Sequence, residues 1–203
     1  MGREARCRAL FNDEAGEGKV VLETDELIFR GPFRLRIRFS DMASVEAVDG
    51  RLEVVFPDGT AAFELGTPEA GRWAERILHP PTLMDKLDVK PGTRVSVVGT
   101  LDESFWADLR RRTDALVEAG GPADVVVWAV EAAAGLAELA AMEDWIQPDG
   151  AIWAVWRRGR RELTENHVRE AALAVGLVDV KVARFSDSHS ALKLVVPKAR
   201  RRR

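Results

Sequence analysis

The hydrophobic pattern of this chain changes at residues 79–81, and that change limits what the chain can fold into. Before it, short runs of alternating apolar and polar residues are typical of antiparallel strands. After it, continuous apolar runs alternate with helix-like segments, which favours a mainly parallel sheet covered by helices. Pro80 and Pro81 follow His79, and they stop a helix because proline lacks an amide hydrogen and restricts the residue before it. We therefore predict domains over 1–79 and 80–197, followed by a basic tail over 198–203 that is disordered because its like charges repel.

The first domain contains seven strand-like runs and one helix. The runs are EARCRALF, KVVLET, ELIFRG, RLRIRFS, SVEAVDG, RLEVVF and TAAFEL. Asp49-Gly50 and Asp58-Gly59 lie between such runs, and Asp-Gly pairs supply the positive φ angles that tight hairpin turns require. The helix, TPEAGRWAERIL, places Trp73 and Ile77 on one face. The pattern predicts a seven-stranded antiparallel β-barrel with a C-terminal helix.

This order of elements, with a tryptophan on the last helix, resembles the pleckstrin-homology-like fold, including its GRAM-type and bacterial versions, over about residues 3–79. The resemblance implies that the helix closes one end of the barrel. Members that bind phosphoinositides use basic residues in and around the first hairpin. Here that connection is NDEAGEGK, with three carboxylates and one lysine, so we do not expect lipid recognition through it.

Two groups of arginines are candidate anion contacts. Arg34, Arg36 and Arg38 alternate with apolar residues, so they share one face of a strand. Arg157 and Arg158 begin the second group, which follows a strand in the second domain. Either group is an anion-binding surface or, more simply, a solvated one.

The second domain alternates strands with helices. We expect a short helix at TLMDKLDV, strands at RVSVVG, ADVVVWAV and GAIWAVW, and helices over about 104–118, 132–145 and 164–175. GLVDVKVARF and ALKLVVP follow, and the short SDSHS segment between them predicts an antiparallel hairpin. The pattern predicts a Rossmann-like, mainly parallel α/β sheet of about five strands that ends in this hairpin.

Residues 92–197 resemble the C-terminal part of class I methyltransferase-like Rossmann folds. DVVVWAV and the later WIQPDGAIWAVW are similar to the fourth strand of those folds and to the turn into their fifth. The domain is more similar still to a family of short bacterial proteins known only as a domain of unknown function. It shares with them KPG-x-RV-x-VVG at 90–99, PDGAIWAVW at 148–156, GLVDVKV at 176–182 and the ALKLVV ending. This second resemblance implies a fold without an activity.

The loop after RVSVVG is the candidate ligand-binding turn. A phosphate cradle normally has two or three glycines, whereas this loop has Gly99 followed by Thr100, Leu101, Asp102 and Glu103. The carboxylates stand where an anion would bind, so phosphate binding is not expected. S-adenosylmethionine is compatible with Asp102, because its amino acid end carries an ammonium group.

The segment between Gly99 and Asp124 has room for only one helix. We therefore expect the second and third strands of a full methyltransferase to be missing, together with the carboxylate that binds the cosubstrate ribose. If ADVVVWAV took the place of the second strand, Glu131 would be that carboxylate. We favour the fourth strand because of the PDG turn that follows, and Glu131 is then an acidic residue at a helix start.

Other chemistry has little support in the sequence. Trp128, Trp153 and Trp156 either line a ligand pocket at the carboxyl ends of the strands or pack in the core. Residues 186–189, SDSH, contain the residue types of a catalytic triad, but neighbours on one turn cannot form one. The three histidines are far apart and Cys7 is alone, so we predict no metal site and no catalytic residue.

Charge and hydropathy limit the partners. Five of the 30 Lys and Arg lie in 198–203, so the folded parts are acidic and a nucleic-acid surface is not expected. No apolar run is long enough to span a membrane, and no secretion signal is recognisable, which favours the cytoplasm. We predict a non-catalytic cytoplasmic protein for small-ligand sensing or for association with a protein partner or with itself, with no cofactor. The alternatives are a degenerate S-adenosylmethionine-dependent transferase and a weak binder of nucleic acid or anionic lipid through the tail.

Overall fold

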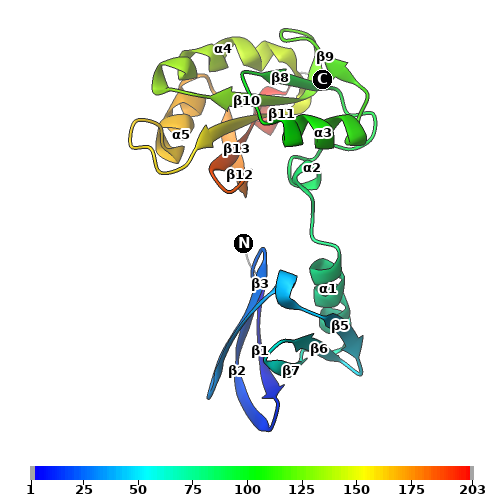
Figure 1. The fold of residues 1–203 in the computed structure, drawn as a ribbon. Coiled ribbons are helices and arrows are strands. Elements are labelled where there is room, and N and C mark those ends of the chain that lie inside the picture. Colours follow the sequence, from blue (N-terminus) through cyan, green and yellow to red (C-terminus); the bar gives the residue numbers. More distant parts are fainter. Residues whose placement is uncertain (1–2, 202–203) are drawn as a thin grey trace. The chain divides into compact units, whose positions relative to one another are not determined.

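The computed structural model describes residues 3–201, and the chain divides into two compact units, Met1–Pro81 and Thr82–Arg203 (Figure 1). Each unit has its own sheet and its own buried core. The units are described separately below.

The first unit is a curled antiparallel sheet of seven strands in the order β4-β3-β2-β1-β7-β6-β5. The strands are β1 Arg3–Phe11, β2 Glu14–Leu22, β3 Glu26–Arg30, β4 Arg34–Arg38, β5 Ser44–Val48, β6 Arg51–Phe56 and β7 Gly59–Glu64. Among residues 3–201 the edge strands β4 and β5 do not pair with each other, so the sheet is a half-barrel rather than the closed barrel expected from the sequence. Helix α1, Thr67–Leu78, packs against β5 and β6.

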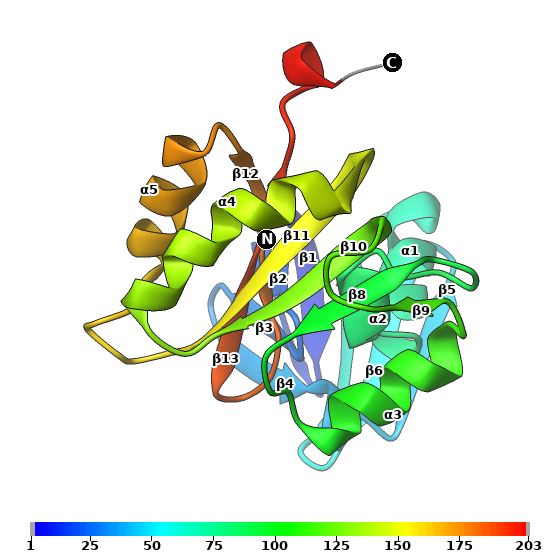
Figure 2. The same cartoon turned by 90° about the horizontal axis from the view of Figure 1, so that it is seen from above.

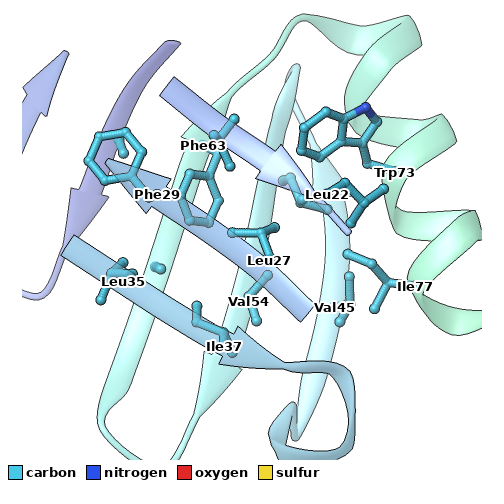
Figure 3. Packing of buried hydrophobic residues seen from close by; sticks show 14 of the residues in the cluster. Leu22, Leu27, Phe29, Leu35, Ile37, Val45, Val54, Phe63, Trp73 and Ile77 are labelled. Carbon is cyan, nitrogen blue, oxygen red and sulfur yellow. The ribbon is translucent and has the colours of Figure 1, made fainter. Parts of the chain in front are cut away.

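The concave side of this sheet holds the core of the first unit (Figure 3). Trp73 and Ile77 point from α1 toward the strands, where they meet apolar side chains such as Leu22 and Val45. Trp73 is fully buried, and its indole Nε1 donates a hydrogen bond of 2.5 Å to Glu69 Oε1 one turn earlier. The alternation seen in the sequence therefore separates a core face from a solvent face.

The hairpin turns of the first unit differ in part from the expected ones. The first hairpin turns at Asn12 and Asp13 alone, because Phe11 already pairs with Glu14, so the carboxylates expected in an eight-residue loop lie mostly on β2. Asp49 and Gly50 both have positive φ, as expected. At the next hairpin Gly59 is already the first residue of β7, and a Cβ there would lie 2.1 Å from Asn12 Oδ1.

The second unit is built on a mixed sheet of six strands in the order β12-β13-β11-β10-β8-β9. The strands are β8 Val95–Val98, β9 Leu116–Val117, β10 Ala123–Val130, β11 Ile146–Arg157, β12 Val178–Arg184 and β13 His189–Val195. Strands β9, β8, β10 and β11 are parallel, whereas β13 is antiparallel to both β11 and β12. The closing hairpin expected from the sequence is present.

Helices cover both faces of this sheet (Figure 2). On one face lie α2, Leu83–Lys86, and α3, Glu103–Arg112. On the other lie α4, Leu139–Met142, which is flanked by 3₁₀ turns η2 and η3, and α5, Glu165–Ala174. Alternate residues of β10 and β11 point to the two faces, so both strands are almost entirely buried.

An ion pair joins the starts of two parallel strands. Arg94, just before β8, donates from Nη2 to Asp124 Oδ1 on β10 over 2.7 Å and from its backbone N to Asp124 Oδ2 over 2.9 Å. The hydrogen bonds and charge of Arg94 hold the pKa of the Asp124 carboxyl below its ordinary value. This pair helps to fix the register of β8 against β10 and therefore where both strands end.

Three segments differ from the sequence expectation. Helix α3 ends at Arg112 rather than near residue 118, because Thr113 is extended and its Oγ1 donates to Thr93 O over 2.9 Å. The expected helix over 132–145 is divided into η2, α4 and η3.

The third segment is the basic tail, expected to be disordered over 198–203. A 3₁₀ turn, η4, covers Lys198–Arg200. Arg200 is held by Glu143 Oε1 at 2.6 Å and by Gly176 O at 2.5 Å, which gives this part of the tail fixed partners. The last two arginines, 202 and 203, lie outside the described residues.

Candidate functional site

Three parallel strands end together at one edge of the second unit's sheet, and a hollow of about 330 Å³ lies there. We call this space the edge hollow. It is lined by residues from the loop after β8, the end of β10, the end of β11 with its following loop, and the start of β13. The lining residues are Thr100, Leu101, Asp102, Ala129, Val130, Glu131, Val155, Arg157, Arg160 and His189. The carboxyl ends of parallel strands are where open α/β sheets bind ligands.

Gly99 makes the turn that brings the β8 loop to the edge hollow. Its φ is +82°, a region that favours glycine. A Cβ on Gly99 would lie 2.9 Å from Ala129 O and 3.0 Å from Ala129 Cβ on the neighbouring strand β10. The turn therefore needs glycine both for its backbone conformation and for this close approach.

The charges around the edge hollow change sign across the sheet. Asp102 follows β8 and Glu131 follows β10, whereas Arg157 ends β11 and Arg160 lies in the loop after it. Among residues 3–201 none of these four side chains makes a hydrogen bond or an ion pair with another residue. Two unpaired carboxylates and two unpaired guanidinium groups thus line one small space.

His189 adds an imidazole to the basic side. Because β13 is antiparallel to β11, its first residue pairs with Arg157 at the end of β11. The Nδ1 atom of His189 lies 2.9 Å from Ser188 Oγ, and its backbone N donates to Ser186 Oγ over 3.1 Å. These serines lie in the turn between β12 and β13, and their hydroxyl groups contact the imidazole and the backbone of His189.

Several predicted site residues lie elsewhere. Trp128 and Trp156 are 2% and 4% exposed and pack in the core under α4 and α5, and neither is among the residues that line the edge hollow. Trp153 faces the opposite side of the sheet, where its Nε1 donates to Leu87 O over 3.0 Å. Arg158 donates to Ser186 O over 3.1 Å and to Asp187 O, so it holds the β12–β13 turn.

The arginines of β4 form the exposed side of an edge strand in the first unit, with Leu35 and Ile37 buried beneath them. Arg36 is bound by both oxygens of Glu26, at 2.6 and 2.7 Å, and these hydrogen bonds hold the pKa of the Glu26 carboxyl below its ordinary value. Arg36 and Arg38 line a shallow space that also contains Asp25 and Glu26, so an anion there would meet both signs of charge.

His189 was not predicted as a ligand contact, and Arg160 was considered only as part of the basic cluster that follows Trp156. The hairpin prediction contained the signal for His189, because a strand antiparallel to β11 must begin where β11 ends. Arg160 was part of a recognised basic cluster, but only the path of the loop after Arg157 shows that it lines the edge hollow.

The sequence also predicted no strand between α3 and β10. The structure has one, β9, whose Leu116 and Val117 pair in parallel with β8 on the side away from β10. Strand β10 lies between β8 and β11 and is parallel to both. Glu118 follows β9, and its backbone O accepts a hydrogen bond from Ser96 Oγ at 3.5 Å.

Two further searches gave negative results for the described part of the chain. Residues 3–201 contain no group of three or more His, Cys, Asp or Glu side chains able to hold a metal ion. No helix within that range is both long enough and apolar enough to cross a membrane.

Known proteins that resemble this chain were found among solved structures. No family model and no curated protein matches the chain. Among solved structures, an S-adenosylmethionine-dependent O-methyltransferase from Thermotoga maritima matches at 11% identity over 95% of this chain and 93% of that one, with a TM-score of 0.44. Ribosomal protein L11 methylase from Lactobacillus delbrueckii subsp. bulgaricus matches at 17% identity over 56% and 74%, with a TM-score of 0.40. A magnesium protoporphyrin IX methyltransferase from Synechocystis, solved with bound S-adenosylmethionine, matches at 12% identity over 57% and 74%, with a TM-score of 0.36.

These matches correct two expectations from the sequence. The three matching structures are a methylase and two methyltransferases, one named as S-adenosylmethionine-dependent and one solved with S-adenosylmethionine bound, so the non-catalytic interpretation and the prediction of no cofactor are not kept. The alternative of a degenerate transferase agrees better with them. Because identities do not exceed 17% in these three structures, no residue role is transferred from them to this chain.

Proposed function

We propose that the second unit binds S-adenosylmethionine in the edge hollow and acts as a transferase that uses it. The observation that carries this proposal is the pair of unpaired carboxylates, Asp102 and Glu131, beside the close turn at Gly99. A carboxylate attracts the ammonium group at the amino acid end of this cosubstrate, and it repels a phosphate.

The residues of the edge hollow fit such a cosubstrate in two respects. Gly99 keeps the β8 loop close against β10, and the space in front of it is free of any side chain from that position. Asp102 and Glu131 provide acceptor oxygens in the segments that follow β8 and β10, two neighbouring strands. Glu118, after β9, is a third acidic residue on the β8 side of the sheet.

When bound, S-adenosylmethionine supplies an electrophilic methyl group. The protein's own part is to hold the cationic end through Asp102 and Glu131 and to leave the β11 and β13 side of the edge hollow for a second molecule. On that side His189 has Nδ1 engaged with Ser188. When Nδ1 accepts from the Ser188 hydroxyl, Nε2 carries the proton and can donate a hydrogen bond to a ligand oxygen.

Calorimetric titration of the full chain with S-adenosylmethionine and with S-adenosylhomocysteine tests the proposal. We expect micromolar binding, weakened about tenfold or more in Asp102→Ala, because a hydrogen bond to a charged group contributes about 1.5–3 kcal/mol. Glu103→Ala is the matched control, since Glu103 is the adjacent carboxylate but is not among the lining residues. Absence of binding, or equal binding by the protein and Asp102→Ala, contradicts the proposal.

For the first unit we propose a pleckstrin-homology-like class. The strand order β4-β3-β2-β1-β7-β6-β5, followed by a helix that packs on β5 and β6, supports it. The proposal concerns architecture, because Arg36 is already bound by Glu26.

A further inference from the structure

The charged residues of the second unit fall into two groups. Several arginines and lysines are paired with carboxylates: Arg94 with Asp124, Arg112 with Asp85, Arg169 with Asp179, Lys193 with Asp88 and Arg200 with Glu143. By contrast, Arg157 and Arg160 line the edge hollow without an ion pair or a side-chain hydrogen bond to any of residues 3–201. Each of the two guanidinium groups therefore has five N–H donors available to a ligand.

The strand order places His189 away from the carboxylates, whereas Arg157 ends β11 next to β10, the strand that Glu131 follows. Across the edge the order is β8, β10, β11, β13, and neighbouring strands lie about 4.8 Å apart. His189 on β13 is therefore about 10 Å from the strand that carries Glu131, and about 14 Å from the strand before Asp102. A small molecule with its charged group directed toward Arg157 and His189 would lie on the β11 and β13 side of the edge hollow.

We propose that Arg157, Arg160 and His189 form a carboxylate-binding wall that recognises a small carboxylic acid as the acceptor substrate. This inference rests on the proposed function for the identity of its partner in the edge hollow. A guanidinium group matches a carboxylate with two parallel N–H donors, and a second arginine with an imidazole strengthens the attraction. Both arginines are exposed, so a neutral acceptor would leave their guanidinium groups to water.

The acidic residues of the edge hollow favour a carboxylate ligand over a phosphate ligand. Asp102 and Glu131 line the same space of about 330 Å³. A dianion would be repelled by them more strongly than a monoanion, because repulsion increases with the product of the charges. The two acidic residues therefore act as a filter against phosphorylated molecules.

The test uses three probes of similar shape and different charge: 4-hydroxybenzoate, neutral 4-hydroxybenzamide and phenyl phosphate. Each is titrated by calorimetry into the full chain and into Arg157→Gln, Arg160→Gln and Arg161→Gln. Arg161 is the matched control, since it is an exposed neighbour that does not line the edge hollow. Circular dichroism of each variant checks that the fold is retained.

We expect 4-hydroxybenzoate to bind about tenfold tighter than the benzamide, and this preference to disappear in Arg157→Gln and Arg160→Gln but not in Arg161→Gln. Equal binding of benzoate and benzamide overturns the inference, and so does a preference that survives both lining variants or a tighter binding of phenyl phosphate. Weaker S-adenosylmethionine binding in the lining variants, with unchanged benzoate binding, would assign the arginines to the cosubstrate instead.

The two proposals fail in different ways. If S-adenosylmethionine does not bind but the carboxylate preference depends on Arg157 and Arg160, only the transferase proposal fails. If S-adenosylmethionine binds through Asp102 and the carboxylate preference is absent, only the carboxylate wall fails.

Discussion

Replacing Gly99 with alanine isolates the contribution of one close backbone approach to the stability of the second unit. The φ of +82° costs a residue with a Cβ about 1–2 kcal/mol, and alanine recovers about 0.4–1 kcal/mol by restricting the unfolded chain. The new Cβ would also lie 2.9 Å from Ala129 O, and that crowding adds about 1–3 kcal/mol because strand β10 is buried and cannot move freely. We expect Gly99→Ala to lower the free energy of unfolding by about 2–4 kcal/mol.

Gly92→Ala is the control for this experiment. Gly92 has a similar φ of +77°, but a Cβ there meets no atom within 4 Å, so only the backbone cost applies. Urea unfolding followed by tryptophan fluorescence measures both variants against the unchanged chain. If both substitutions lower the free energy of unfolding equally, the close approach of Gly99 to Ala129 does not contribute to stability, and the reasoning is refuted.

Two further substitutions test other contacts of the second unit. Because Arg94 lowers the pKa of Asp124, the stabilisation is present above the unfolded-state pKa of about 3.9 and is lost as the pH falls through the lower folded value. Asp124→Asn should therefore cost more at pH 7 than at pH 3, with a difference below about 1 kcal/mol because the pair is over one-third exposed. Thermal unfolding at the two pH values checks this, and an equal cost at both would contradict it. Trp153→Phe removes the hydrogen bond to Leu87 O and should cost about 1–3 kcal/mol, whereas Trp106→Phe, at a partly exposed ring, should cost below about 1 kcal/mol in urea unfolding. Equal losses in the two tryptophan variants would argue against a role for the Leu87 contact.

Local patterns were enough to predict much of the architecture. In the first unit the alternation of residues such as Leu35 and Ile37 with arginines defines each strand, and Asp49-Gly50 has the backbone that a tight turn requires. In the second unit the continuous apolar run at β10 is typical of a buried strand. These signals are contained within a few residues, so they do not depend on the tertiary fold.

Other elements depend on contacts that are distant in sequence. Strand β9 consists of two residues, Leu116 and Val117, which are too few to show a period, and it exists because β8 lies beside it. The segment over 132–145 is rich in alanine, leucine and glutamate, all good helix formers, yet it contains Gly135 and forms two 3₁₀ turns around one four-residue helix. The edge hollow is a similar case, since its lining comes from four separate segments.

The acidic loop after Gly99 shows how the sign of a charge decides which ligand a turn can accept. Asp102 argues against a phosphate at this turn because a second anion would be repelled. That argument does not extend to a ligand with a positive charge, and the structure places Glu131 at the same hollow, also without a protein cation as its partner. Unpaired carboxylates favour a cationic ligand, while unpaired guanidinium groups at the far strands favour an anionic one. The two signs of charge therefore agree with the proposed pairing of a cationic cosubstrate group with an anionic acceptor.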